Sequence, residues 1–355
     1  MEFIDYMQAH GHQQLAVWTD AEAGVKSFIA IHDTTLGPAL GGTRIWRHPT
    51  DEAAIMDVLR LSRAMTYKSA AAGLPLGGGK GLIVADPRKD KTEAMLRSYG
   101  RFVESLGGRY ITTEDVGATG QDMEWIAKET SHVVGLPQSA GGSGNPAVVT
   151  GFGVYQAMRA CAEDVWGSDS LEGRTVAMQG FGNVATSLAG YLVAAGARLV
   201  VTDIDAGARE RAAAIEGVTL VEPDAIYDVE CDIFAPCALG GVLNERSIPK
   251  LRCAIVCGAA NNQMATDQDD NRLAARGILY APDFIANAGG VINVYYEYAG
   301  DYQEAAAMEK AGNIYATTKQ VIALSRERGI TTAEAADAVA EVRLTARAQP
   351  LTHKG

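Results

Sequence analysis

The feature that most constrains the fold is a glycine-rich hexapeptide between a short apolar run and a helical pattern. Residues 180–185 read Gly-Phe-Gly-Asn-Val-Ala and fit G-x-G-x-x-A. They follow a β-prone run at 174–179 and precede a helical pattern at about 183–195. In a βαβ unit the first glycine permits a tight turn, the second lets backbone approach a pyrophosphate, and the alanine allows close helix–strand packing. The pattern therefore predicts a parallel sheet that binds a dinucleotide.

The same turn supplies most of the residues that we expect at a cofactor site. The N-terminus of the following helix offers N–H groups and the positive end of a helix dipole to phosphates. Asp203 ends the next strand-like run, about 20 residues after the second glycine, where a carboxylate binds ribose hydroxyls. Because a carboxylate repels a 2′-phosphate, the sequence favours NAD over NADP. The predicted cofactor-binding residues here are Gly180, Phe181, Gly182, Asn183, Val184, Ala185 and Asp203.

Length and composition predict two domains and argue against several kinds of partner. A chain of 355 residues exceeds the usual size of a single core. The net charge of −12 argues against a general nucleic-acid-binding surface. The N-terminus lacks a signal-peptide pattern, and no apolar run reaches membrane-spanning length. We therefore expect a cytoplasmic protein that acts on a small molecule, without nucleic-acid or membrane partners.

The cysteines and histidines give no sign of a metal site. The five cysteines are Cys161, Cys231, Cys237, Cys253 and Cys257. They form no C-x-x-C pair, no histidine cluster accompanies them, and their odd number excludes a complete set of intrachain disulfides. We expect reduced, mostly buried thiols and no bound metal. His10 and His12, two residues apart near the start, are expected to be exposed.

Strand and helix patterns alternate along the chain in two blocks. A small, polar, glycine-rich stretch at 139–146 is the best boundary between them, with a surface loop as the alternative. Thr331 and Glu334 have capping-box spacing before a C-terminal helix. Strands are expected at 25–31, 82–84, 109–112, 174–179, 198–202, 233–235, 254–257 and 278–280, and helices at 51–65, 93–106, 148–163, 183–195 and from 331 onward.

Two lysines stand in unusual local settings. Lys68 lies near the end of an amphipathic helical pattern, and Lys80 follows three glycines and precedes an apolar run. Three consecutive glycines are costly to order, so they suggest a close approach of backbone to a ligand beside a lysine in a cleft. A buried lysine near a second cation can serve as a general base. The alternative is a flexible glycine loop with an exposed lysine.

Seven segments together resemble the glutamate/leucine/phenylalanine/valine dehydrogenase family, in particular its leucine dehydrogenase branch, over residues 2–340. The segments are 35–44 (TLGPALGGTR), 65–68 (MTYK), 77–80 (GGGK), 113–117 (TEDVG), 180–185 (GFGNVA), 258–262 (GAANN) and 287–293 (NAGGVIN). The resemblance implies an α/β fold of two domains separated by a cleft. A substrate-binding, catalytic and oligomerisation domain would span 1–138, with the helix at about 331–355 returning to it. A Rossmann-type NAD-binding domain would span 146–330.

The resemblance also implies an activity and roles for individual residues. The family oxidatively deaminates an L-amino acid to a 2-oxo acid and ammonia while NAD⁺ is reduced. Lys68 matches the lysine that binds the substrate carboxylate, and Lys80 matches the one that activates water. Asp115 matches the aspartate that handles the protons of the amino group. Other matched positions are Gly41 and Gly42 in the pocket backbone, and Asn262 and Asn287 near the nicotinamide, where a loop cap is the alternative for each asparagine.

The position that selects the substrate is apolar in this chain. In the glutamate branch a lysine binds the distal carboxylate, and Leu40 stands at the matching position. An apolar residue leaves a buried carboxylate unpaired, which costs several kcal/mol. Val291 and Val294 would complete an aliphatic pocket, while Thr113 departs from the small apolar residue usual there. We expect branched-chain substrates (leucine, valine and isoleucine), with phenylalanine or another aromatic amino acid as the alternative.

Two readings of another class compete with an amino-acid dehydrogenase. A folate or hydroxy-acid dehydrogenase shares the nucleotide-binding fold but does not need both lysine motifs, and a hydroxy-acid enzyme usually needs a catalytic histidine. A non-catalytic NAD-binding module is the other reading, against which Lys68, Lys80 and Asp115 argue. The family resemblance further implies a homo-oligomer, often an octamer.

Overall fold

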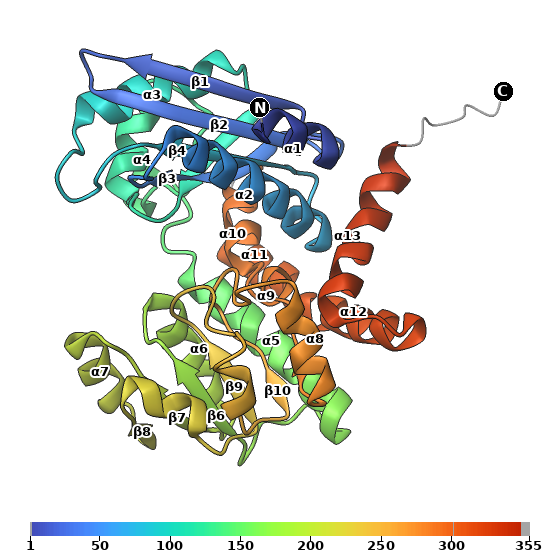
Figure 1. The fold of residues 1–355 in the computed structure, drawn as a ribbon. Helices are drawn as coiled ribbons and strands as arrows, with labels where there is room; N and C mark the ends of the chain where they lie inside the picture. The colour runs from blue at the N-terminus through green and yellow to red at the C-terminus, as the bar shows by residue number, and fades with distance from the viewer. Residues whose placement is uncertain (1, 301, 349–355) are drawn as a thin grey trace. The chain divides into compact units, whose positions relative to one another are not determined.

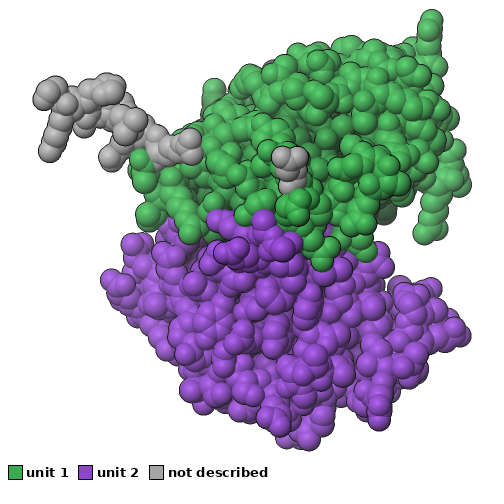
Figure 2. All heavy atoms as spheres, turned by 180° about the vertical axis from the view of Figure 1, so that it is seen from behind, with its two compact units in different colours: residues 1–145, 293–304, 340–355 green, residues 146–292, 305–339 purple. Residues whose placement is uncertain are grey.

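The chain folds into two compact units. The computed structural model describes residues 2–300 and 302–348. Unit 1 comprises residues 1–145, 293–304 and 340–355, and unit 2 comprises 146–292 and 305–339 (Figure 2). Residues 293–304, which the sequence assigns to the second domain, thus group with unit 1. No helix of the described part of the chain is long and apolar enough to cross a membrane.

Unit 1 is built on a five-stranded mixed sheet of order β1-β2-β4-β3-β5 (Figure 1). β2 pairs antiparallel with β1 and β4, whereas β3 runs parallel to β4 and β5. The sequence missed β1 and β3. The strands are β1 (Gln14–Asp20), β2 (Val25–Asp33), β3 (Ala39–Ile45), β4 (Gly77–Ile83) and β5 (Tyr110–Glu114).

Helices cover both faces of this sheet because its strands are apolar on both sides. Along β2, Phe28 and Ala30 pack against the helix α2, while Ile29 and Ile31 belong to the core shared with α3 and α4. Such alternation follows from the two-residue period of a strand. The helices of this first segment are α1 (Glu2–His10), α2 (Asp51–Ala71), α3 (Glu93–Ser105) and α4 (Gly120–Ala127).

The helix α2 begins where the sequence predicts and ends later. The hydroxyl of Thr50 accepts a hydrogen bond from the N–H of Ala53, and Asp51 and Glu52 lie in the first turn. This cap and the two acidic residues stabilise the positive end of the helix. The helix continues to Ala71, past the expected end at residue 65, so Lys68 lies within its last turn.

The triple glycine lies in a strand, so its interpretation as a loop is wrong. β4 starts at Gly77 and contains the whole GGGK segment, which extends the strand expected at 82–84. A Cβ at Gly78 would lie 2.1 Å from the backbone nitrogen of Thr66 in α2. A Cβ at Gly79 would lie 2.6 Å from the ring of Tyr110. Close packing by neighbouring elements on both faces therefore explains these glycines.

Unit 2 contains a six-stranded parallel sheet of order β11-β10-β9-β6-β7-β8, as expected for a doubly wound nucleotide-binding fold. The sequence located every strand except β8. The strands are β6 (Thr175–Gln179), β7 (Arg198–Thr202), β8 (Val218–Leu220), β9 (Ile233–Pro236), β10 (Ile255–Val256) and β11 (Leu279–Tyr280). The remaining helices of the chain are α5 (Ala147–Trp166), α6 (Asn183–Ala194), α7 (Ala206–Ala213), α8 (Gln268–Ala275), α9 (Asp283–Ala286), α10 (Gly289–Tyr298), α11 (Glu304–Gly312), α12 (Ile314–Arg328) and α13 (Thr332–Ala348).

The C-terminal helix α13 starts with the expected capping box. The N–H of Thr331 donates to Glu334 Oε2 at 2.8 Å, and the N–H of Glu334 donates to Thr331 Oγ1 at 3.3 Å. From residue 340 onward the helix groups with unit 1. There, Arg343 donates a 2.6 Å hydrogen bond to the carbonyl of Ala70. This contact adds a side-chain donor at the C-terminal end of α2, where the backbone carbonyls lack the usual helical partners.

Two histidines are buried between α1 and α2. His32 Nδ1 lies 2.8 Å from Thr66 Oγ1, and His32 Nε2 lies 2.9 Å from the carbonyl of His10. His12 packs edge-on against His32, with 4.7 Å between ring centroids. His10 is exposed as expected, but the same expectation for His12 is wrong. Burial lowers the pKa of His12, and burial lowers that of His32 to about 4.

We predict that unit 1 loses stability as the pH falls from about 6.5 to about 4. An unfolded histidine binds a proton near pH 6.5, whereas native His32 does so only near pH 4, so acid favours the unfolded chain. The free energy of unfolding should fall by up to roughly 3 kcal/mol through this one group. Urea denaturation at several pH values would measure it. His32→Gln removes the titrating ring and should flatten the pH dependence, while an unchanged slope would contradict the assignment.

Candidate active site

The predicted site residues of unit 1 lie on the face of the sheet that α2 covers. Leu40 is paired with Gly78, and Gly42 is paired with Thr113. A Cβ added at Gly78 would point toward α2. Lys80 follows Gly78 by two residues on β4 and therefore points to the same face. Strand pairing and alternation thus bring together Leu40, Gly42, Lys80 and Thr113 from three segments of the sequence.

The central contact of this face is an ion pair between Lys80 and Asp115. Lys80 is 6% exposed, and its Nζ lies 2.5 Å from Asp115 Oδ2. Asp115 follows β5 directly and is partly buried. A charge-assisted hydrogen bond of this length in a sheltered site fixes both side chains. The exposed lysine that the sequence left open as an alternative is therefore excluded.

Two charged residues that sequence reasoning missed extend this pair. Arg44 lies on the same face of β3, and its Nε is 3.3 Å from Asp115 Oδ2. The other end of its guanidinium, Nη1, lies 2.9 Å from Asp57 Oδ2 in α2. His48 Nε2 is 3.3 Å from the same oxygen of Asp57. Arg44 belongs to the GGTR segment and follows Gly42 by two residues. On a strand this spacing places both residues on one face, and this was the sequence signal that could have located Arg44.

The charge of Asp115 is set by its two basic neighbours. Burial alone raises the pKa of this carboxyl, but the positive charges of Lys80 and Arg44 outweigh burial. The hydrogen bond from Lys80 acts in the same direction, and the pKa of Asp115 falls to about 2. Asp115 is therefore a carboxylate at neutral pH and accepts hydrogen bonds without donating any.

Two glycines on β3 keep the neighbouring strands close enough for these contacts. A Cβ at Gly41 would lie 1.7 Å from the carbonyl oxygen of Gly79. A Cβ at Gly42 would lie 2.7 Å from Asp115 Cβ. Tyr110 also donates a 2.7 Å hydrogen bond to the carbonyl of Gly41 from the opposite face. Any side chain at Gly42 would therefore displace Asp115.

The other predicted side chains of unit 1 differ in their burial. Lys68 is half-buried in the last turn of α2, two residues after the threonine that packs on Gly78. Leu40 is 1% exposed, and Thr113 is half-buried. Val294 is buried in α10. These residues offer one further cation and an apolar wall.

A further residue missed by the sequence is Glu297, also in α10. Its carboxylate accepts hydrogen bonds from the N–H groups of Gly135, Leu136 and Ser143 at 2.8–3.1 Å. It also accepts one from the hydroxyl of Ser143 at 2.6 Å. Glu297 thereby holds the segment 135–143, which precedes unit 2, against α10. More than 150 residues separate these partners, so no local pattern could reveal the contact.

In unit 2, the glycine turn has the features of an anion-binding helix start. Gly180 has φ +99°, and a Cβ there would lie 2.5 Å from Ala238. Gly182 caps α6 without any side-chain hydrogen bond, and no atom lies within 4 Å of the place of its missing Cβ. Backbone N–H groups at the start of α6 are thus left for a ligand. Phe181 and Ala185 are buried in the core, so only their backbone atoms can face a ligand.

Asp203 lies beside this turn, immediately after β7. Its Oδ2 accepts a 2.6 Å hydrogen bond from the N–H of Phe181, and its Oδ1 accepts one from Asp205 at 2.8 Å. Each carboxylate oxygen has a second acceptor position. Asp203 therefore stabilises the turn and can still accept hydrogen bonds from hydroxyl groups.

Of the two predicted asparagines, Asn262 lies on a loop, and Asn287 donates hydrogen bonds to the same loop. Asn262 is exposed and adopts φ 51°, a left-handed conformation unusual for a residue with a side chain. Asn287 is 5% exposed and donates from Nδ2 to the carbonyl of Ala259 and to Asn261 Oδ1. Its Oδ1 is buried without a partner within the described part of the chain. Val291 is buried in α10. Asn287 thus supports the loop and retains an acceptor for a ligand.

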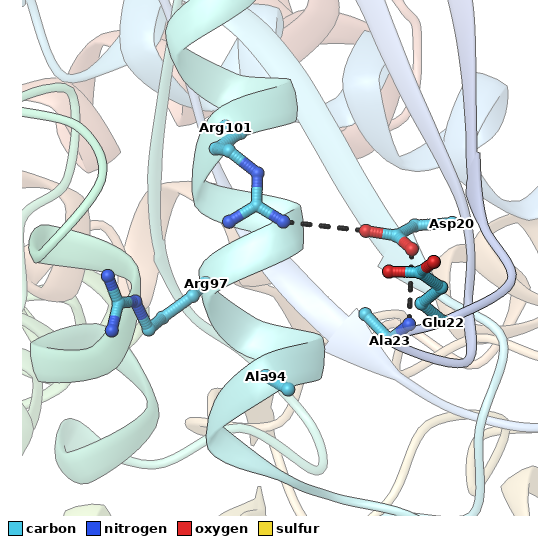
Figure 3. Close-up of a pocket in the computed structure, with 6 residues that line it drawn as sticks. All are labelled: Asp20, Glu22, Ala23, Ala94, Arg97 and Arg101. Carbon is cyan, nitrogen blue, oxygen red and sulfur yellow. Dashed lines mark hydrogen bonds and ion pairs between the residues drawn. The ribbon is translucent and has the colours of Figure 1, made fainter.

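A hollow of about 340 Å³ lies elsewhere in unit 1, between the β1–β2 turn and α3 (Figure 3). It is lined by Asp20, Glu22, Ala23, Ala94, Arg97 and Arg101. Three of its four charged residues are already paired, because Arg101 lies 3.4 Å from Asp20 and Arg97 lies 2.6 Å from Glu129. None of the predicted site residues lines it.

Comparison with known families identifies the same two parts of the chain. Residues 12–132 match the family described as Glu/Leu/Phe/Val dehydrogenase, dimerisation domain. Residues 141–209 and 204–349 match the family described as Glutamate/Leucine/Phenylalanine/Valine dehydrogenase.

Individual relatives extend over nearly the whole chain. A leucine dehydrogenase of Bacillus cereus is 51% identical over 97% of this chain and 94% of its own length. A valine dehydrogenase of Streptomyces coelicolor is 47% identical over 96% of this chain and 94% of its own. The crystal structure of L-tryptophan dehydrogenase from Nostoc punctiforme shares 45% identity and superposes with a TM-score of 0.85, covering 97% of this chain and 99% of that one.

These matches and the two-unit α/β fold agree with the family resemblance drawn from the motifs. They exclude the hydroxy-acid and folate dehydrogenase readings, because both domain matches fall in one family. The chain belongs to the glutamate/leucine/phenylalanine/valine dehydrogenase family and is an amino-acid dehydrogenase.

Proposed function

We propose that this enzyme oxidatively deaminates the branched-chain L-amino acids leucine, valine and isoleucine with NAD⁺, reversibly. One amino acid, one water and one NAD⁺ yield a 2-oxo acid, ammonium, NADH and a proton. The observation that carries the proposal is the sheltered Lys80–Asp115 pair on the same sheet face as the apolar Leu40. Relatives named leucine and valine dehydrogenase support the substrate class.

The proposed mechanism assigns a task to each of three charged residues, Lys68, Lys80 and Asp115. The Lys68 ammonium binds the substrate carboxylate. Bound NAD⁺ supplies the acceptor for the hydride that leaves Cα. The Asp115 carboxylate accepts a proton from the substrate amino group, and Lys80, once its ammonium has given up a proton, takes one from the water that attacks the iminium carbon. The 2.5 Å contact between Lys80 and Asp115 gives a direct route for proton exchange between them.

The polar groups of unit 2 fit a dinucleotide. The uncapped start of α6 at Gly182 offers N–H groups to a pyrophosphate. The fixed Asp203 carboxylate accepts ribose hydroxyls and repels a 2′-phosphate. Arg209 donates to Val221 and Glu222, so this cation is already engaged by other acceptors. We propose NAD as the cofactor, with Asn262 and Asn287 near the nicotinamide.

The proposed substrate pocket is apolar and contains no cation for a distal carboxylate among its assigned wall residues. Leu40, Val291 and Val294 form the aliphatic wall, and Thr113 adds one hydroxyl. An aromatic L-amino acid is the second candidate, favoured by the similarity to an enzyme named L-tryptophan dehydrogenase. Substitution at Leu40 or Thr113 would change the space available to such a side chain.

We further propose a cytoplasmic homo-oligomer, with an octamer as the assembly that the family resemblance implies. The matched family at 12–132 is described as a dimerisation domain. In this proposal, 1–138 and the C-terminal helix serve catalysis and assembly, while 146–330 binds NAD. Light scattering coupled to gel filtration would measure the assembly.

We predict that Lys80→Ala lowers kcat by about 10²–10⁴-fold, because the general base is lost. NAD⁺ binding should remain nearly unchanged, since Lys80 and the glycine turn belong to different units. NADH absorbance and NAD⁺ titration by calorimetry would measure the two effects. Lys89→Ala is a matched control, because its side chain is 80% exposed. A Lys80→Ala enzyme with more than half of the wild-type kcat would refute the assignment.

We predict that leucine, valine and isoleucine are oxidised with kcat/KM at least roughly 10²-fold above glutamate, because a distal carboxylate would be buried without a partner. NADH formation across a panel of L-amino acids measures this directly. If glutamate is the best substrate, the pocket argument is wrong. If tryptophan or phenylalanine is best, the proton chemistry stands and the second candidate replaces the first.

We predict that Asp203→Ala narrows the preference for NAD⁺ over NADP⁺. The variant loses ribose hydrogen bonds with NAD⁺ and relieves repulsion of a 2′-phosphate that carries about −1.5 to −2 charges. Comparing kcat/KM for both cofactors in each protein gives the ratio. Asp224→Ala removes an exposed acidic residue of the same unit as a control. An unchanged ratio in Asp203→Ala would remove this residue from the cofactor site.

A further inference from the structure

Two cysteines of unit 2 lie opposite each other at the amino ends of adjacent strands. Ile233 in β9 is paired in register with Ile255 in β10 (Figure 1). Two residues earlier in each segment are Cys231 and Cys253. The N–H of Cys231 donates to the carbonyl of Arg252 at 3.2 Å, so the pairing continues to the cysteines. Adjacent strands lie about 4.8 Å apart, within the range of Cα separations that a disulfide spans.

The two thiols shift each other's pKa in opposite directions and are therefore not equivalent. Contact with the Cys231 thiol lowers the pKa of Cys253, and the charge of Arg276 acts in the same direction. The same contact and burial raise the pKa of Cys231. Arg276 is held in place by a 2.8 Å hydrogen bond to the carbonyl of Leu251. Both cysteines are only partly buried, so a small oxidant can reach them.

The other three cysteines do not combine partial exposure with a neighbouring thiol and a lowered pKa. Cys161 and Cys257 are fully buried, and burial raises the pKa of each thiol. Burial also raises the pKa of Cys237 to about 12. A thiol with a raised pKa forms little thiolate, the reactive species. These three residues therefore serve as internal controls for the pair.

We infer that Cys231 and Cys253 form a redox-active dithiol that closes reversibly to a disulfide. A hydroperoxide is the oxidant. The Cys253 thiolate attacks one peroxide oxygen, the O–O bond breaks, and a sulfenic acid forms on Cys253. The Cys231 sulfur then attacks the Cys253 sulfur, the S–S bond forms and water leaves. The two thiols lose two electrons and two protons, and hydrogen peroxide becomes two waters. A dithiol reductant reverses the bond by exchange.

The position of the pair separates this chemistry from the proposed active site. The cysteines precede β9 and β10, at the amino edge of the sheet. The carboxyl end of β9 leads to Ala238, which contacts the glycine turn at Gly180. The disulfide would close the segment 231–253 into a loop and restrict the unfolded chain. We therefore expect oxidation to raise the stability of unit 2 and to leave dehydrogenase activity within about twofold.

The test oxidises the full-length protein with hydrogen peroxide, alkylates the remaining thiols and maps the peptides by mass spectrometry. The expected product is one cross-linked peptide pair containing Cys231 and Cys253, two hydrogen atoms lighter than the separate peptides. Dithiothreitol should restore both thiols. Cys231→Ser should instead accumulate a sulfenic acid on Cys253, detected with dimedone. Cys253→Ser should slow the oxidation of Cys231 at least about tenfold.

Thermal unfolding provides a second measurement on the same samples. Oxidised wild type should unfold at a higher temperature than reduced wild type, while a double Cys231→Ser, Cys253→Ser variant should show no difference. The inference fails if Cys231 and Cys253 both survive oxidation as free thiols, or if the cross-links join other cysteines. It also fails if the double variant shows the same shift as wild type.

Discussion

The close packing around β4 is the constraint on which the active-site half of unit 1 depends. Each glycine of 77–79 weakens a strand by about 0.5–1 kcal/mol relative to alanine. Packing offsets that cost, because α2 and the ring of Tyr110 press on β4 from opposite faces. A Cβ at Gly78 would strike the backbone of α2 and move the whole helix. The first side chain of β4 is therefore that of Lys80, which points to the face covered by α2 and is 6% exposed.

Because this packing shelters the charged side chains from water, each charge needs a close partner of opposite sign. Taking an ammonium and a carboxylate out of water costs several kcal/mol per ion, and only close pairing repays it. Lys80, Asp115, Arg44 and Asp57 alternate in charge and sum to zero. Removing any one of them leaves the cluster with a net charge. The arrangement thus fixes the side chains before a substrate arrives, which would reduce the reorganisation required during the proposed proton transfer.

Sequence reasoning succeeded where the signal was local and failed where tertiary contacts decided the structure. The turn at 180–185, the cap at Thr50 and the box formed by Thr331 and Glu334 each use neighbours within a few residues. β4 was misplaced because glycine disfavours strands, and only the contact with Thr66 shows why glycine is required there. Arg44 and Glu297 were missed because their partners lie far away in the sequence. The family resemblance assigned Lys80 and Asp115 to one site, and their side chains lie 2.5 Å apart in the structure.

The helix α10 adds a constraint that neither unit supplies alone. Val291 belongs to unit 2 and Val294 to unit 1, yet both are on one continuous helix from Gly289 to Tyr298. Residues three apart on a helix share a face, with about 5–6 Å between their Cβ atoms. The separation of these two valines is therefore fixed by the helix, however the units are arranged. Glu297, one turn further on, anchors the same helix to the segment 135–143, so a change at Glu297 would act through α10 on the proposed pocket wall.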